Sequence, residues 1–445
     1  MIDIFSLTAN KLVEKLKEGE ISSVEVCTQY IDRIKKFEKD VKAWAHFDKK
    51  ELLEKAEEAD EYRKSGKPLG SLHGLPVAVK DIIGTLDMPT ECGTVIRKKM
   101  TGSQEAEVVN LLKIAGAIVM GKTETTELAY FHPGKTTNPH DYSRTPGGSS
   151  SGSAAAVASH MAPLSIGSQT NGSVIRPASY CGVVGYKPSY GLISRSGVLK
   201  QSDKLDHIGV FGKSVEDVAL LTKVLIKKDQ HDSSTIHYSA DEMLKVCKKG
   251  PPYEPKFIFY KTKSWKKIDK ESQKSFELFI EAFEKNIELF DTPSYFDEIP
   301  KYHKVIHETD MANNFQVYYK KSKKKLSKEM ISAIERGMKY SAKEYAEAID
   351  FMKQSYKSYQ EVFEDYHGVL TPCTTGVADK GLKSTGSPEF CTVWTYMGLP
   401  SISLPLLSGS NNLPLGIQLI GDRLDDLRFL GVANWLEKNC KKYAK

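Results

Sequence analysis

The hydrophobic positions of this chain change repeatedly between helical and strand spacing. From Ser22 to Phe37, apolar residues recur every three or four positions and predict a helix with one buried stripe. Ser22 and Glu25 form the pair expected of a capping box, which gives this helix a defined start. The first part of the chain is therefore expected to pack as a helix against a core.

From Gly74 to Asp81 the apolar period becomes two. Val77 and Val79 would point to one face of a strand, and Ala78 and Lys80 to the other. A lysine at the end of an apolar strand needs a reason. Taken alone, the simplest reason is a surface lysine at a strand terminus.

Further helices and strands alternate along the chain. We expect helices over residues 50–64, 105–115, 153–159, 214–227, 271–288, most of 327–366, and 425–439. We expect strands over residues 117–120, 163–166, 256–260, 368–371, 401–406 and 415–420. This order is typical of an α/β layer fold. It predicts one large α/β domain over residues 1–445, with a mixed twisted sheet covered by helices on both faces.

Residues from about 229 to 366 differ in composition, because lysine, tyrosine and phenylalanine become more frequent there. We interpret this region as a mostly helical insertion that sets partner or substrate preference. Its aromatic residues are interpreted as helix packing rather than a ligand box. They are Tyr340, Tyr345, Phe351, Tyr356, Tyr359 and Phe363.

Glycine and serine crowd the segment from Thr145 to Pro188. Its first serine cluster, residues 147–152, precedes an alanine-rich helix, where unpaired N–H groups favour electron-rich oxygen. Its second cluster, residues 167–173, is a turn between a short strand and another helix. Backbone N–H groups of such a turn can converge on one point, as an oxyanion hole requires.

This pattern resembles the amidase signature family of serine hydrolases. The resemblance rests on residues 147–157, Gly172-Ser173, residues 176–178 and 181–185, and on a lysine motif at 74–81. Further matching blocks are residues 205–211, 397–400 and 413–421. The likeness covers about residues 1–228 and 368–440, with the core motifs from about residue 65 onward.

The resemblance implies a Ser-Ser-Lys triad. Ser173 would be the nucleophile, Ser149 the bridging serine held by a cis peptide, and Lys80 the base. It also implies an oxyanion hole made by backbone N–H groups of Thr170, Asn171, Gly172 and Ser173. Tyr130 and Phe131 precede the serine loop and could line an acyl pocket or pack in the core.

The chain departs from the family pattern Asp-x-Gly-Gly-Ser-x-Arg in three ways. Gln169 replaces the aspartate, Asn171 replaces the first glycine, and the arginine, Arg176, stands one place later. Because the aspartate and arginine would normally pair, losing both is less damaging than losing one. The shape of the oxyanion turn therefore stays open.

The residue types fit amide chemistry. An amide is a poor electrophile, so the attacking hydroxyl must lose its proton as it attacks. Lysine can take that proton only when neutral, and burial lowers its pKa. Together with the resemblance, this implies a hydrolase that cleaves linear carboxylic amides, other than peptide bonds, through a serine acyl-enzyme, without cofactor or metal.

Three other sequence features could indicate a site, but each gives weaker support for one. Ser150 lies in a Gly-x-Ser-x-Gly pattern with Asp206 or His207 as partners, but no hydrophobic strand precedes it. Residues 116–123 match the P-loop pattern, yet the residues between the two glycines are themselves a strand. The histidines have no metal-ligand spacing, and His73, His160 and His207 are interpreted as structural or surface residues.

Two alternatives remain for the function. One is the A subunit of a glutamyl-tRNA(Gln) or aspartyl-tRNA(Asn) amidotransferase, which would release ammonia from glutamine in a complex. Asn171 and Arg176 differ from the expected motif there, and the cluster from Ser149 to Gly152 is more similar to stand-alone amidases. The other is a scaffold that binds without cutting, against which the presence of all three triad residues counts.

Composition and charge indicate the class of protein and the cellular compartment to expect. Hydrophobic residues make up 40% and charged residues 27%, as in soluble globular proteins. The net charge of +6 comes partly from the lysine run at 320–325, interpreted as a solvated helix face. Seven scattered cysteines, no signal peptide and no membrane-length apolar run predict a reduced cytoplasmic protein. We expect a small-molecule amide substrate, no membrane and, outside the amidotransferase alternative, no nucleic acid; a homodimer is left open.

Overall fold

A computed structural model describes residues 3–443, with side chains described for residues 3–440. One mixed sheet of 11 strands runs through the molecule. The strands lie in the order β1 (Trp44–His46), β3 (Ile118–Thr123), β2 (Pro76–Lys80), β4 (Leu164–Gln169), β6 (His207–Gly212), β5 (Val184–Lys187), β10 (Ser401–Ser408), β11 (Pro414–Ile420), β9 (Gly368–Pro372), β7 (Phe257–Tyr260) and β8 (Ile287–Phe290).

The strand directions explain how distant segments meet. β2 runs parallel to both β3 and β4, so the carboxyl ends of these strands lie at one edge. The next strands are antiparallel to their neighbours, in the pairs β4–β6, β6–β5, β5–β10, β10–β11 and β11–β9. β7 is again parallel to β9 and to β8. The end of β2 carries Lys80, and the end of β4 leads into the second serine turn.

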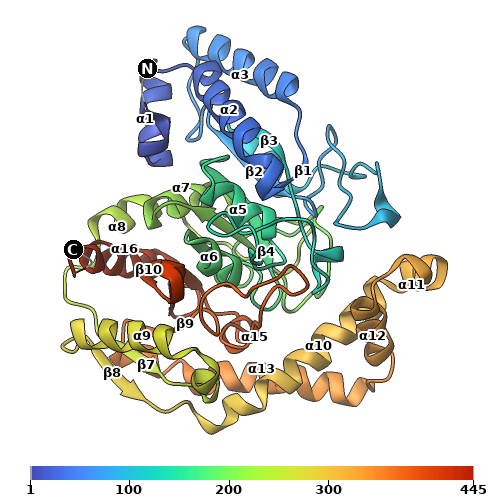
Figure 1. The fold of residues 1–445 in the computed structure, drawn as a ribbon, viewed down its shortest axis with the longest axis vertical. Coiled ribbons are helices and arrows are strands. Elements are labelled where there is room, and N and C mark those ends of the chain that lie inside the picture. The colour runs from blue at the N-terminus through green and yellow to red at the C-terminus, as the bar shows by residue number, and fades with distance from the viewer. Residues whose placement is uncertain (1–2, 444–445) are drawn as a thin grey trace.

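Helices flank this sheet (Figure 1). They are α1 (Ala9–Glu18), α2 (Ser23–Val41), α3 (Lys49–Lys64), α4 (Glu107–Ile114), α5 (Ser151–Ala158), α6 (Ile175–Cys181), α7 (Val215–Leu225), α8 (Met243–Lys249), α9 (Lys270–Ala282), α10 (Ile299–Asn314), α11 (Gln316–Ser322), α12 (Lys328–Gly337), α13 (Ala342–Tyr359), α14 (Val362–Asp365), α15 (Thr392–Tyr396) and α16 (Asp426–Tyr443). Together they form the predicted single α/β domain.

Local sequence signals set several helix starts. The capping box at Ser22 and Glu25 is present at the start of α2. Ser214 accepts a hydrogen bond from the N–H of Asp217 and so caps α7. These contacts satisfy N–H groups that a helix start would otherwise leave unpaired.

The core has a main cluster and a second aromatic cluster under the insertion. In the second cluster Tyr359 and Phe363 are buried, and Tyr359 lies 5.8 Å, between ring centroids, from Trp394. The other four aromatic residues of the predicted packing set lie against the same cluster. The structure thus shows these rings packed between helices, although Tyr345 also lines a large cavity.

One predicted helix is wrong in its last six residues. The helix expected over residues 271–288 ends at Ala282, and Ile287–Phe290 forms β8 at the sheet edge. Asn286 explains the change, because its side chain donates to the carbonyl of Pro255 at 2.9 Å and its own carbonyl accepts from Phe257. Tertiary pairing with β7 therefore overrides helix propensity.

Candidate active site

Lys80 ends β2 and is fully buried. Its Nζ donates to the Oγ of Ser149 at 2.7 Å and to the Oγ of Ser168 at 2.9 Å. The pKa of Lys80 is lowered from 10.5 to about 7, mainly by burial; the charge of Asp206 opposes this change, and the charge of Arg176 adds to it. The lysine at this strand end is thus a buried amine held against a serine, not a surface group.

Ser149 follows a cis peptide bond between Gly148 and Ser149. Its carbonyl accepts a hydrogen bond from the N–H of Thr126 at 3.3 Å. Ser168, the second partner of Lys80, was missed by sequence reasoning. The alternation of β4 could have pointed to it, since Ser168 lies one residue before the end of that strand.

Ser150 has a structural place between the two serine clusters. It is fully buried, and its Oγ donates to the carbonyl of Ser168 at 3.1 Å and accepts from the N–H of the same residue at 3.2 Å. Its N–H donates to the carbonyl of Ser173 at 3.4 Å. A hydroxyl occupied in this way, inside the protein, does not fit the nucleophile-elbow interpretation.

Gln169 holds the second serine turn. Its Oε1 accepts from the N–H of Val174 at 2.8 Å and of Ile175 at 3.0 Å, at the start of α6. Its Nε2 donates to the Oγ1 of Thr395 on α15 at 2.9 Å. A neutral glutamine therefore caps the helix where the family pattern has an aspartate, without needing an arginine partner.

Two carbonyl groups of this turn accept hydrogen bonds from side chains outside it. Nε2 of His303, on α10, donates to the carbonyl of Thr170 at 2.9 Å, and Thr395 donates to the carbonyl of Asn171 at 2.5 Å. Within the described residues, no acceptor takes the backbone N–H of Thr170, Asn171, Gly172 or Ser173. The four groups are thus left free to bind an oxygen atom.

Ser173 borders a narrow cavity whose lining includes both predicted pocket residues, Tyr130 and Phe131, together with His307 and Gln201. The rings of Tyr130 and Phe131 meet edge to face, 4.7 Å apart. Among the described residues, no hydrogen bond joins the hydroxyls of Ser149 and Ser173. The two serine clusters are joined instead through Ser150.

His307 was missed by sequence reasoning because it lies in the unmatched insertion. Its Nε2 bonds the Oε1 of Gln201 at 2.8 Å, and burial keeps its pKa well below the usual value. His303, one turn earlier on α10, has its pKa lowered to about 4 by burial. α10 thus brings two neutral imidazoles to the serine turn.

The family model for amidases matches residues 25–430, which is most of the chain. The chain belongs to the amidase family. The A subunit of the glutamyl-tRNA(Gln) amidotransferase of Natranaerobius thermophilus is 30% identical, over 98% of this chain and 96% of that protein.

Solved structures agree with this family assignment. The A subunit of the glutamyl-tRNA(Gln) amidotransferase of Thermotoga maritima is 30% identical, with a TM-score of 0.81 over 99% of this chain and 96% of that one. A crystal structure of an amidase is 25% identical, with a TM-score of 0.85 over 97% of this chain and 100% of that one. This chain is therefore similar both to amidotransferase subunits and to a protein named simply as an amidase.

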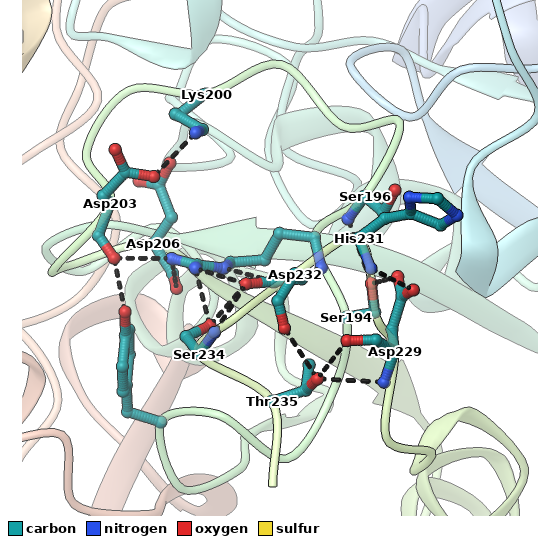
Figure 2. A network of polar contacts seen from close by, with 12 residues as sticks. Ser194, Ser196, Lys200, Asp203, Asp206, Asp229, His231, Asp232, Ser234 and Thr235 are labelled. Atoms are coloured by element: carbon teal, nitrogen blue, oxygen red, sulfur yellow. Dashed lines mark hydrogen bonds and ion pairs between the residues drawn. The ribbon is translucent and has the colours of Figure 1, made fainter.

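In this member of the amidase family, a larger cavity of about 780 Å³ lies beside the site, and Ser168, Thr170 and Asp206 contribute to its lining. Figure 2 shows the polar network there. Arg195 pairs with Asp232 at 2.9 Å and donates to the carbonyl of Asp203 at 2.8 Å. The network fixes the loop carrying Asp206, whose Oδ1 accepts from the hydroxyl of Thr170 at 2.7 Å.

Other predicted residues lie outside the site. Lys122, in the P-loop-like stretch, is buried and donates to the carbonyl of Ile83 at 2.6 Å and to Thr90 at 2.7 Å. His207 bonds the carbonyl of Leu205 through Nδ1, and all seven cysteines are buried as thiols rather than disulfides. The described part of the chain holds no group of three or more metal-ligating residues and no helix that could cross a membrane.

Proposed function

We propose that this chain hydrolyses a carboxylic amide C–N bond through a serine acyl-enzyme. Ser173 is the nucleophile, Ser149 carries the proton, and Lys80 is the base. The observation that carries this proposal is the buried contact of 2.7 Å between Lys80 and Ser149, with a lysine pKa of about 7. A lysine in bulk water would be almost fully protonated at about pH 7 and could not accept a proton.

The proposed reaction keeps its protons inside the site. The neutral Nζ of Lys80 accepts the proton of Ser149, and Ser149 accepts that of Ser173 as the oxygen of Ser173 attacks the carbonyl. The proton returns by the same route to the leaving nitrogen, and water then cleaves the acyl-enzyme. The contact between the two serine hydroxyls has to form when substrate binds, as catalytic hydrogen bonds commonly tighten only then.

The second serine turn would stabilise the negative oxygen of the tetrahedral intermediate. Its four N–H groups have no acceptor within the described residues, and hydrogen bonds from Gln169, Thr395 and His303 hold the turn. Donors fixed in advance need no reorganisation during the reaction, so each contributes fully.

The experiment is ammonia release by the purified chain from a panel of aliphatic, aromatic and glutamine-type amides. We expect turnover of at least one amide by the native protein and almost none by Ser173→Ala protein of unchanged fold. Ser150→Ala is the matched serine control and should keep measurable turnover. Normal turnover by Ser173→Ala would contradict the proposal.

A second candidate is the A subunit of an amidotransferase that takes ammonia from glutamine. The relatives favour it over a free-standing amidase, since the protein of Natranaerobius thermophilus aligns over nearly the full length of both chains. It would require partner subunits and tRNA. Size-exclusion of the protein from its native extract separates the two: a solitary peak with amidase activity supports the first, and a complex with glutamine-dependent activity supports the second.

We also propose that the region of about residues 229–366 sets substrate preference. It supplies α10, which places His307 in the lining of the cavity at Ser173 and His303 against the turn.

A further inference from the structure

β8 is the last strand at one end of the sheet, beside β7 (Figure 1). It pairs with β7 in a regular parallel register over all four of its residues and, among the described strands, has no neighbour on its other edge. A strand in this position directs alternate N–H and C=O groups away from the sheet. Within the described residues, no side chain and no backbone group outside β7 bonds to the backbone of Glu288, Leu289 or Phe290. This edge can therefore accept a further strand.

The opposite edge of the sheet, at β1, is blocked by the chain itself. β1 has three residues, and its register with β3 is irregular between Trp44 and His46. The carboxylate of Glu38 accepts from the N–H of Ala43 at 2.9 Å and from that of Trp44 at 3.1 Å, so the backbone there is already bonded. Short, irregular edges prevent unwanted strand pairing, as do lysine and proline on the edge. Over its four residues β8 has no register shift, lysine or proline.

β8 also exposes apolar side chains on both faces. Leu289 is 55% exposed and Phe290 is 45% exposed. Glu288, the one charged residue of the strand, already accepts from the hydroxyl of Tyr366 at 2.7 Å, and the ring of Phe290 lies edge to face against the same tyrosine. Because successive residues of a strand alternate between faces, Leu289 lies on the face opposite to Glu288 and Phe290. Pairing with another strand would remove apolar surface from water on both faces.

The two ends of β8 carry opposite charges. Lys285 precedes the strand and Asp291 follows it; both are exposed, and neither takes part in an ion pair within the described residues. A second β8 lying parallel to the first would bring like charges together. An antiparallel β8 would instead bring each lysine toward an aspartate, which is favourable across strands. The charges of this segment are therefore complementary to those of its own copy, in the arrangement that a two-fold axis generates.

We propose that β8 is the pairing edge of a homodimer, in which β8 of a second copy of this chain lies antiparallel to it across a two-fold axis. The two sheets then form one continuous sheet. Residues directly opposite each other share a face, so Leu289 lies opposite Leu289 of the second copy, and Glu288 lies opposite Phe290. A register centred on Glu288 would place two carboxylates opposite each other, which is destabilising. In the register centred on Leu289, Lys285 is a diagonal neighbour of Asp291 of the second copy. The pairing does not depend on the proposed function.

Sedimentation equilibrium of the purified full chain, from about 1 µM to about 200 µM, measures the dimer directly. Because the paired segment is short, we expect a concentration-dependent dimer with a Kd of about 1–100 µM. Leu289→Lys places two like charges opposite each other and should raise the Kd at least about tenfold. Ile114→Lys is the matched control, since Ile114 is 74% exposed on α4, which packs on β3 near the other end of the sheet; its Kd should stay. A chain that is monomeric at about 200 µM, or a Kd that Leu289→Lys leaves unchanged, would overturn the proposal.

A charge exchange tests the antiparallel direction with exposed residues, whose substitution leaves the core intact. Lys285→Asp and Asp291→Lys should each raise the Kd about twofold to fivefold, because each brings like charges together at both ends of the paired strands. The double exchange should restore the native Kd, since opposite charges meet again. A double variant that dimerises more weakly than either single variant would overturn the antiparallel arrangement.

Cross-linking tests the register. The seven native cysteines are buried, so Leu289→Cys adds an exposed thiol that a short bismaleimide can reach. Because opposite Cβ atoms in an antiparallel pair lie about 5 Å apart, we expect covalent dimers on a denaturing gel. Ile114→Cys protein, with an exposed thiol on α4, should stay monomeric under the same conditions. Equal cross-linking of the two variants, or none at Leu289→Cys, would overturn the pairing centred on Leu289.

Discussion

The pH dependence of the reaction follows from the burial of Lys80. With a pKa of about 7, roughly half of the Lys80 amines are neutral at pH 7, whereas with a pKa of 10.5 only about one in three thousand would be. Burial thus increases the share of active base by more than about a thousandfold. We expect kcat/KM for a good amide to rise with pH through a limb near pH 7.

The assay is ammonia release at low substrate concentration from pH 5.5 to about pH 9, because kcat/KM reports the pKa values of the free enzyme. Ser168→Ala should move the limb to lower pH, since the hydroxyl of Ser168 accepts from Nζ and favours the charged amine. Lys187→Met is the control: Lys187 is also buried with a pKa of about 7, but it donates to the carbonyl of Leu399. A limb that is absent, or that moves with Lys187 and not with Ser168, would refute the reasoning.

Stability tests the same pKa independently of turnover. Between about pH 7 and pH 10.5 the unfolded chain binds more protons at Lys80 than the folded chain, so stability rises with pH in that window. Below about pH 7 the folded protein keeps a charged amine buried, and this lowers the free energy of unfolding by about 5 kcal/mol, at about 1.4 kcal/mol for each unit of the pKa shift. Lys80→Met should therefore be stabilised relative to the native protein most at low pH, and a difference independent of pH would contradict this.

Three further predictions concern the same machinery. Lys80→Ala should remove nearly all turnover and Ser149→Ala should be severe but less complete, with unchanged circular dichroism; near-normal rates would count against these roles. Gln169→Ala should lower the free energy of unfolding in urea by about 1–3 kcal/mol and kcat by at least about tenfold, because the N–H groups of Val174 and Ile175 lose their acceptor. An unchanged kcat would show that the Gln169 cap does not hold the turn in its active shape. Arg336→Ala should lower the free energy of unfolding by about 1–2 kcal/mol, because it removes the guanidinium that lies 2.6 Å from the buried carboxylate of Glu308 on α10. The effect is smaller than for a fully buried pair because Arg336 is partly exposed to solvent. An unchanged unfolding midpoint would show that the pair contributes nothing.

Much of the fold could be predicted because its signals are local. The capping pair at Ser22 and Glu25, the alternation around Val77 and the glycine-rich turns each act within a few residues. β8 could not be predicted in this way, because Ile287 becomes a strand residue only by pairing with Phe257 on a distant strand.

The same difference between local and distant signals separates the site residues that could be predicted from those that could not. Lys80, Ser149 and Ser173 stand in motifs, and their expected positions followed from the sequence. Gln169 as a cap, Ser168 as a second partner of Lys80, and His307 in the cavity depend on contacts between segments far apart in the chain. Only Ser168 had a local signal, its place in the alternation of β4; the roles of Gln169 and His307 depend on residues that no local pattern identifies.

The identity of the nucleophile is tested most directly by covalent labelling. The native protein is incubated with a fluorophosphonate, digested, and mapped by mass spectrometry. The account predicts one adduct, on the serine at position 173, and its loss in Lys80→Ala protein. An adduct on Ser149, Ser150 or Ser168, or labelling of Ser173 that does not depend on Lys80, would contradict it.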